Sequence, residues 1–179
     1  MKEEGIEKIV FSEEQIQAQV AKMAEMLSRD YAGKDPIIVG ILRGCFYFLA
    51  DLTRYMTIPV SIDFLSIGVY PEMTKKTGIV RFNKELDTSI KNRHVLLVED
   101  IVGTGLTLSY ICQHLEAYNP ASLKICTLLD NPKERLLALN IDYSCFVMPD
   151  SFLVGYGLDY EQKYRNLPYI AAYRQEKQR

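Results

Sequence analysis

Two adjacent carboxylates and a glycine loop stand together in the middle of this sequence. Glu99 and Asp100 follow four branched aliphatic residues, and the loop Gly103-Thr104-Gly105-Leu106-Thr107 comes shortly after them. Glycines allow the backbone to turn tightly and to direct N–H groups at a ligand, and threonine hydroxyls are further donors. Because a helix is expected to begin there, its positive end adds to the attraction, so the loop predicts an anion site, most naturally for a phosphate.

The carboxylates restrict the ligand further, because two negative side chains would repel a phosphate placed beside them. They can hold hydroxyl groups or a cation, so a ribose diol on Glu99 and Asp100 with its 5-phosphate on the loop satisfies both features. The loop is not a P-loop, since no Gly-Lys-Ser/Thr follows, and the acids precede the glycines, unlike in the dinucleotide fingerprint. A tight strand-to-helix connection without a ligand is the simpler alternative.

The surrounding pattern predicts strands that alternate with helices. The aliphatic run before Glu99 is typical of a strand buried on both faces, so the acids should lie at its carboxyl end and face a cleft. Ser12 and Gln15 form a capping-box pattern, and Asn131-Pro132 with Glu134 indicates another helix start. We expect helices near 16–31, 46–55 and 106–118, and strands at 37–41, 59–65, 95–98 and 123–129. The prediction is an α/β fold with a parallel twisted sheet flanked by helices.

Length and composition restrict the classes of protein to which this chain can belong. A chain of 179 residues is one domain of ordinary size. With a net charge of -2 and a pI near 5.8 it has no basic field, so we expect no nucleic-acid partner. The four cysteines form no Cys-x-x-Cys pair and lie in apolar runs, as in a protein of the reducing cytosol. No apolar run reaches membrane-spanning length and the N-terminus lacks a signal-peptide pattern, so we predict a cytoplasmic protein with no membrane partner.

Three motifs, in the same order along the chain, resemble one known family. Residues 98–108 are similar to the phosphoribosyl-diphosphate motif of type I phosphoribosyltransferases, in particular the hypoxanthine-guanine enzymes. Leu42-Arg43-Gly44 with residues 46–52 resembles the family's diphosphate loop and first core helix, and residues 152–160 and 164–169 resemble its purine-covering C-terminal segment. The resemblance spans nearly the whole chain. It implies a single domain, 1–179, with a core at about 36–130 and a small hood from the N-terminal segment and about 140–179.

The resemblance implies transfer of a ribosyl 5-phosphate from 5-phosphoribosyl 1-diphosphate to a purine nitrogen. The leaving diphosphate carries negative charge, and Mg²⁺ suits its hard oxygens. By the same resemblance, Glu99 and Asp100 bind the ribose hydroxyls directly or through metal-bound water, and Asp159 anchors the magnesium shell. These three residues are therefore the expected metal-binding residues. In Gly-Leu-Asp-Tyr, however, Asp159 could also simply cap a turn.

The resemblance also implies the remaining contacts to diphosphate and purine. Arg43 and Gly44 match the diphosphate loop, which in that family follows a cis peptide bond, and Arg165 matches an arginine that reaches the diphosphate from the C-terminal side. Phe152 would stack on the purine, and Leu153 would offer backbone groups to the base edge. The plainer alternatives are a solvated arginine and a core phenylalanine. The residues expected at the purine are Asn131, Phe152, Leu153 and Asp159.

The segment 66–91 is unusual for its length and its mixture of glycine, proline and charged residues. Long loops in compact domains often act as lids. In the resembled family this loop ends in a short strand pair and closes over the reacting centre, where it excludes water. Tyr70 matches the loop's tyrosine, whereas Val69 stands where serine is common. A solvated connector is the alternative.

Two departures from the family pattern bear on activity. Gly103 stands where the family usually has an aspartate that accepts or relays the purine N7 proton, and Asn131 stands where it has a lysine that donates to the 6-oxo group. Because positioned acid-base groups contribute about 10² to 10⁴-fold, the enzyme should be slow rather than inactive. Gly103→Asp should raise turnover about ten-fold to a thousand-fold, unless a positive φ at this position disfavours aspartate. Lys133 is a candidate replacement for the missing lysine.

Three functions remain open from the sequence. The leading hypothesis is a purine phosphoribosyltransferase, a homodimer or homotetramer, that makes IMP or GMP from hypoxanthine or guanine in purine salvage. The second is a weakly active or inactive paralogue that binds nucleotide as a sensor or partner subunit. The third is an RNA-binding regulator with the same fold, which the acidic pI and the lack of a clustered basic stripe oppose.

Overall fold

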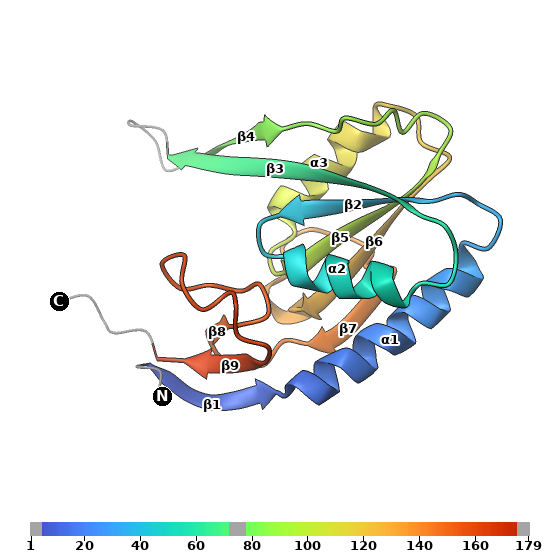
Figure 1. The fold of residues 1–179 in the computed structure, drawn as a ribbon. Coiled ribbons are helices and arrows are strands. Elements are labelled where there is room, and N and C mark those ends of the chain that lie inside the picture. Colours follow the sequence, from blue (N-terminus) through green and yellow to red (C-terminus); the bar gives the residue numbers. More distant parts are fainter. Residues whose placement is uncertain (1–4, 72–77, 175–179) are drawn as a thin grey trace.

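The computed structural model describes residues 5–71 and 78–174, and a six-stranded sheet forms its centre (Figure 1). Its strands are β2 (Ile37–Leu42), β3 (Ser61–Pro71), β4 (Gly78–Lys84), β5 (His94–Val102), β6 (Ser122–Asp130) and β7 (Tyr143–Val147). They lie in the order β4-β3-β2-β5-β6-β7, and all neighbours are parallel except β4, which runs antiparallel to β3 at one edge. The predicted α/β class with a largely parallel sheet is confirmed.

Helices cover both faces of this sheet. They are α1 (Glu13–Asp30), α2 (Phe46–Tyr55) and α3 (Leu106–Glu116). α1 and α2 lie on one face and α3 lies on the other (Figure 1). β5 shows the alternation clearly, because Leu96 and Val98 belong to the apolar cluster with α1 and α2, whereas Val95 and Leu97 belong to the cluster with α3. Burial on both faces explains why this strand is a continuous aliphatic run in the sequence.

A second, smaller sheet brings the two ends of the described chain together. Its strands are β1 (Ile6–Phe11), β8 (Leu153–Val154) and β9 (Ile170–Tyr173), in the antiparallel order β1-β9-β8. Leu153, Tyr156 and Ile170 belong to the same apolar cluster as α1 and α2, so the small sheet packs against the rest of the fold. The segment between β8 and β9 also reaches the loop after β2, where Gly157 lies against Gly44.

Helices begin at both predicted positions, but only the first has its side-chain cap and continues as an α-helix. Ser12 caps α1 with a complete capping box, in which its hydroxyl accepts from Gln15 N–H and the Gln15 side chain accepts from Ser12 N–H. After Asn131 a helix begins at Pro132 as predicted, but it is a 3₁₀ helix of three residues, Pro132–Glu134, and the Asn131 side chain does not cap it. The chain leaves this turn because Leu136 N–H bonds to a carbonyl of the loop after β5 instead of continuing a helix.

Several strands extend beyond their predicted limits. β5 continues through Glu99 and Asp100 to Val102, so the acids lie within the strand and not after its end. β3 continues to Pro71 and pairs with β4, so much of the segment predicted as a long loop is an antiparallel ribbon. β7 extends the central sheet past residue 130. In the described ranges, no helix is long and apolar enough to cross a membrane.

Candidate active site

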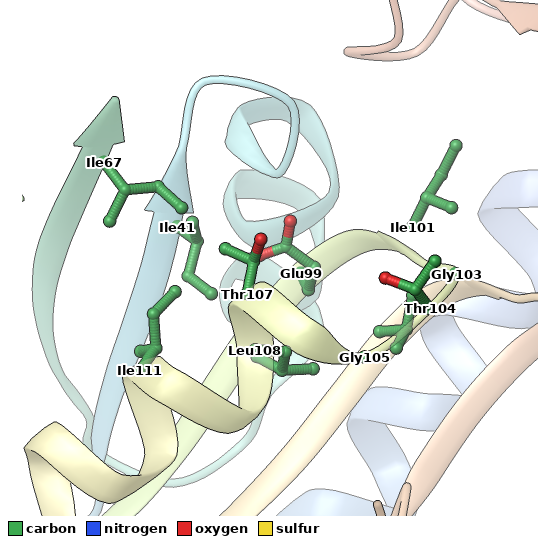
Figure 2. Close-up of a pocket in the computed structure, with 11 residues that line it drawn as sticks. Ile41, Ile67, Glu99, Ile101, Gly103, Thr104, Gly105, Thr107, Leu108 and Ile111 are labelled. Carbon is green, nitrogen blue, oxygen red and sulfur yellow. The ribbon is translucent and has the colours of Figure 1, made fainter. Parts of the chain in front are cut away.

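A cavity of about 320 Å³ lies between β5, the start of α3 and the neighbouring strands β2 and β3 (Figure 2). Among the predicted site residues, Glu99, Gly103-Thr104-Gly105 and Thr107 line it. Apolar side chains complete its walls: Ile41, Ile67, Ile101, Val102, Leu108 and Ile111. In Figure 2 the oxygens of Glu99 and Thr107 point in the same direction. The fold therefore brings a predicted carboxylate and the predicted phosphate loop to one cavity.

The loop after β5 has the geometry of a helix N-terminus. Gly105 is the N-cap of α3 with a φ of 80°, and its carbonyl accepts from Ser109 N–H at 2.8 Å to begin the helix. Gly105 has no side chain with which to cap the first turn. Since the first amides of a helix lack intrahelical acceptors, they can donate to an anion, and the Thr107 hydroxyl on the cavity wall is a further donor.

Glu99 and Asp100 are half-buried carboxyls that are costly to ionise. Burial raises the pKa of both, and for Glu99 the neighbouring Asp100 carboxyl raises the pKa further. Among the described residues Glu99 Oε2 has no hydrogen-bond partner, whereas Asp100 Oδ1 accepts from Ile101 N–H at 2.8 Å. The Arg165 guanidinium partly offsets the raised pKa of Asp100. A cation or a pair of hydroxyl groups would lower the cost of charging this pair, so the acids suit either ligand.

The loop between β2 and α2 lies directly against Asp100. The Leu42–Arg43 peptide bond is cis, as the family resemblance implies. A Cβ atom at Gly44 would collide with the Asp100 carboxylate, so only glycine permits this approach. From the other side, a Cβ at Gly157 would collide with the Gly44 carbonyl oxygen. The predicted diphosphate loop is therefore held between a carboxylate of β5 and the segment after β8.

Arg165 links the C-terminal segment to the same loop. Its guanidinium donates to the Gly157 carbonyl at 2.6 Å and pairs with Asp159 at 2.8 Å. Gln162 Oε1 accepts from Arg165 at 3.1 Å and from Arg43 at 2.9 Å. One amide thus bridges the two arginines expected at the diphosphate. Both arginines also line a second cavity of about 300 Å³.

Asp159 is engaged by neighbours within its own segment. It pairs with Arg165, and its Oδ2 accepts from Gln162 N–H at 2.8 Å, which are the contacts of the turn-capping alternative. Within residues 5–71 and 78–174 no three Asp, Glu, His or Cys side chains are grouped to hold a metal ion. Glu99 and Asp100 offer the carboxylate oxygens that suit Mg²⁺, whereas Asp159 would have to leave Arg165 to join them.

The position expected to donate to a purine 6-oxo group is buried. Asn131 follows β6 and is 5% exposed, and its Nδ2 faces Met148 Sδ at 3.9 Å, a weak acceptor. Lys133, the candidate replacement for a lysine at this position, pairs with Asp150 at 3.2 Å on the surface. In this arrangement neither side chain directs a charged donor into the cavity of β5.

Phe152 and Leu153 lie at the start of β8. Phe152 is 39% exposed, so it is not a core residue, and its ring meets Tyr160 and Tyr173 edge-on with centroids 5.9 and 6.4 Å away. Leu153 is buried and pairs with Ala172 of β9. An exposed ring fixed by two aromatic neighbours suits stacking on a planar ligand.

The expected lid residues lie near the end of β3. The backbones of Val69 and Tyr70 pair with Val80 and Ile79 of β4. Their side chains, and residues 72–77, lie outside the part of the chain that the structure describes. The role of this segment as a lid stays a prediction.

Four residues without a predicted site role also contact these loops: Glu134, Arg135, Gly157 and Gln162. Glu134 Oε2 lies 3.2 Å from the point that a Cβ of Gly103 would occupy. The Arg135 guanidinium binds the Asp130 carboxylate and approaches the Val102 carbonyl at 3.5 Å. The paired glycines around Tyr156 were a signal for Gly157. Glu134 belonged to a helix-capping pattern that gave no sign of a site role, and Arg135 and Gln162 belong to no motif.

Comparison with known proteins identifies the family. The family model described as phosphoribosyl transferase domain matches residues 9–161. A hypoxanthine-guanine phosphoribosyltransferase of Streptococcus pneumoniae is 42% identical over 176 residues, which cover 98% of this chain and 98% of that protein. A crystal structure of a hypoxanthine phosphoribosyltransferase from Staphylococcus aureus is 40% identical, with a TM-score of 0.90 over 95% of this chain and 92% of that chain. A hypoxanthine-guanine phosphoribosyltransferase structure from Bacillus anthracis is also 40% identical, with a TM-score of 0.87 over 94% and 98%. The resemblance carried by the three sequence motifs is thereby confirmed, and the chain belongs to the phosphoribosyltransferase family.

Proposed function

We propose that this protein transfers the 5-phosphoribosyl group of 5-phosphoribosyl 1-diphosphate to hypoxanthine or guanine. The products are IMP or GMP and diphosphate, so the reaction serves purine salvage. The observation that carries the proposal is the cavity shared by Glu99 and the loop from Gly103 to Thr107, beside the Arg43-Gly44 loop. The named activity of relatives that align over nearly their full length supports the same choice.

Each part of the site suits one part of the sugar diphosphate. The 5-phosphate fits the start of α3, where helix amides and the Thr107 hydroxyl can donate to it. The ribose hydroxyls fit the carboxylates of Glu99 and Asp100, which in their ionised form only accept hydrogen bonds and so match hydroxyl donors. The diphosphate fits Arg43 and Arg165, because charge-assisted hydrogen bonds from guanidinium groups are strong and directional.

The reaction joins purine N9 to ribose C1 and breaks the bond from C1 to the diphosphate oxygen, which keeps the electron pair. Positive charge develops on the sugar, and negative charge grows on the leaving group. Interactions with these developing charges lower the barrier, because they are stronger in the transition state than in the bound substrate. In this site the acid pair would face the sugar, and the two arginines would face the leaving diphosphate.

Magnesium fits the acid pair. Glu99 and Asp100 would hold it directly or through water, since burial makes their charges costly and one Glu99 oxygen is unpartnered among the described residues. When bound, Mg²⁺ would neutralise part of the charge on the diphosphate oxygens. Asp159 is a further proposed ligand, and it would exchange its ion pair with Arg165 for that role.

The purine would lie between Phe152 and the end of β6. Phe152 offers an exposed aromatic ring for stacking, and Leu153 offers backbone groups to the base edge. Asn131 can donate to a 6-oxo oxygen only as a neutral amide, which makes a weaker hydrogen bond than a lysine does. We therefore expect a weaker preference for 6-oxopurines than a lysine at this position would give.

Steady-state kinetics test this function. The assay measures nucleoside monophosphate formed from hypoxanthine, guanine or xanthine with 5-phosphoribosyl 1-diphosphate and Mg²⁺. We expect turnover with hypoxanthine or guanine, and we expect its loss when Glu99→Gln and Asp100→Asn are combined. If no base gives a nucleotide while IMP still binds, the protein is a nucleotide-binding paralogue and not this enzyme.

We also propose that the enzyme acts in the cytoplasm as a homodimer or homotetramer. Its four cysteines are free and buried, which suits a reducing compartment. Sedimentation velocity over a range of protein concentrations would determine the oligomer, and a purely monomeric protein would contradict that part of the proposal.

A further inference from the structure

Glu134 places a carboxylate beside Gly103, a site position where the family usually has an aspartate and this chain has no side chain. Its Oε2 lies 3.2 Å from the point that a Cβ of Gly103 would occupy, and Gly103 lines the site cavity. An aspartate carboxylate is joined to its own Cβ by a single bond, so it would lie in the same region as the Glu134 oxygen. Apart from the chain neighbours of Gly103, no other described atom lies within 4 Å of that point.

Backbone hydrogen bonds fix the segment that carries this carboxylate. On one side of Glu134, Asn131 N–H donates to the Val102 carbonyl at 2.9 Å. On the other side, Leu136 N–H donates to the Thr104 carbonyl at 3.0 Å. Glu134 is therefore attached from both directions to the loop that contains Gly103, and is not a surface side chain that reaches it by chance.

The proposed reaction must remove one proton from the purine. Hypoxanthine and guanine carry an N–H in the five-membered ring, and this proton must leave when N9 bonds to the sugar. Gly103 has no side chain that could accept this proton. Glu99 and Asp100 are assigned to the sugar, and Lys133 is a cation paired with Asp150. Beside position 103, the Glu134 carboxylate is the group with the right chemistry.

We propose that Glu134 accepts the purine N7 proton in this protein, in place of a side chain at position 103. The inference rests on the proposed function. As N9 attacks, its lone pair forms the bond to the sugar, and the diphosphate leaves with the electron pair of the bond to C1. The N7–H electron pair stays in the purine ring, and the proton passes to Glu134. Because Glu134 is exposed, it can release the proton to water.

The first test removes the charge of Glu134 without changing its shape. We expect Glu134→Gln to slow the chemical step by about 10² to 10⁴-fold, with little change in the affinity for 5-phosphoribosyl 1-diphosphate. The rate should be measured in a single turnover, because product release limits kcat in many enzymes. Glu116→Gln, an exposed glutamate at the end of α3, is the matched control and should leave the rate unchanged. Glu134→Asp should retain part of the rate.

The second test asks whether a carboxylate at position 103 replaces Glu134. In the wild-type background, Gly103→Asp should raise the rate less than about ten-fold, because an acceptor is already present. In the Glu134→Gln background, the same substitution should restore most of the lost rate. Gly103 has no positive φ, so the backbone accepts aspartate, and the exposed Glu134 side chain can move aside.

The single-turnover rates of these variants decide whether Glu134 accepts the proton. Equal single-turnover rates for the wild type and Glu134→Gln would overturn the inference and leave the proposed function standing. A slow Glu134→Gln that Gly103→Asp fails to repair would also overturn it, because Glu134 would then act by positioning the loop. A wild type with no turnover on any purine would overturn the proposed function and the inference together.

Discussion

The two loops at the mouth of the site are held in different ways. The loop Gly103-Thr104-Gly105 turns directly from β5 into α3, and its shape follows from glycines and a helix start within a few residues. The Arg43-Gly44 loop follows β2, but its position depends on distant parts of the chain. Asp100 lies against one side of Gly44, and Gly157 lies against the other.

The two loops therefore differ in whether a side chain can be added at their glycines. A Cβ at Gly103 would meet only the tip of the exposed Glu134 side chain, which can move. A Cβ at Gly44 would meet the half-buried Asp100 carboxylate, and one at Gly157 would meet backbone. Position 103 of the predicted phosphate loop should therefore tolerate side chains that Gly44 and Gly157 cannot. Substitutions at the two loops test this difference directly.

The largest loss of folding stability is expected at Gly157. Gly157→Ala adds a Cβ that collides with the Gly44 carbonyl, in a backbone conformation of positive φ that disfavours alanine. We expect a loss of about 3 to 5 kcal/mol in the free energy of unfolding, with weaker binding of diphosphate. Urea denaturation and calorimetry measure these quantities.

Gly33→Ala is the matched control for this substitution. Gly33 also has a positive φ, but a Cβ there has nothing within 4 Å. It should lose only about 1 to 2 kcal/mol, the conformational part of the cost. If both variants lose the same stability, the close packing of Gly157 on Gly44 is not what holds the diphosphate loop.

The acid pair should contribute to binding and not to stability at neutral pH. Two lost charge-assisted hydrogen bonds, at about 1.5 to 3 kcal/mol each, predict that Glu99→Gln with Asp100→Asn weakens binding of 5-phosphoribosyl 1-diphosphate with Mg²⁺ by more than about 100-fold. Isothermal titration measures this. Unchanged affinity, with a large loss of stability, would instead make the pair a structural element.

The pH dependence of the magnesium-free protein follows from the raised pKa of both acids. The folded state favours their protonated forms, so their contribution to stability is greatest at acidic pH. It is lost as pH rises above their ordinary values of 3.8 and 4.5 toward the raised pKa of each group. At pH 7 the double amide variant should therefore be at least as stable as the wild type in thermal unfolding.

The phosphate loop should bind a nucleoside monophosphate independently of catalysis. At a concentration 100 times its Kd, IMP or GMP should add about 2.7 kcal/mol to stability. For a protein of this size that corresponds to a rise in Tm of roughly 5 to 10 °C. Inosine, which lacks the phosphate, is the control and should give a smaller shift. Equal shifts for inosine and IMP would show that the loop does not hold the phosphate.

The smallest change in folding stability is expected at Gly103. Gly103→Ala requires no strained backbone and meets only the Glu134 side chain, so stability should change by no more than about 0.5 kcal/mol. Thermal unfolding beside Gly157→Ala gives the comparison directly. A loss at Gly103 as large as that at Gly157 would mean that the phosphate loop is as tightly packed as the diphosphate loop.

Local signals in the sequence predicted the elements that depend on local interactions. The capping box at Ser12 begins α1, and the aliphatic run before Glu99 is a strand buried on both faces. The same kind of signal was only partly informative at Asn131, where a helix begins as predicted but ends after three residues and lacks the side-chain cap. There the chain bonds to the loop after β5, and a tertiary hydrogen bond outweighs a weak helix start.

Motifs, repeating apolar patterns and glycine positions act through near neighbours in the chain, so they were enough to predict the family and the parallel sheet. The role of the loop from Gly103 to Thr107 in phosphate binding stays a prediction. Three features of the site depend on the tertiary fold: how costly Glu99 and Asp100 are to ionise, which distant glycine confines Gly44, and which carboxylate lies beside Gly103. Burial and close approach join residues far apart in the chain. The environment of a side chain therefore depends on packing that no single stretch of sequence contains.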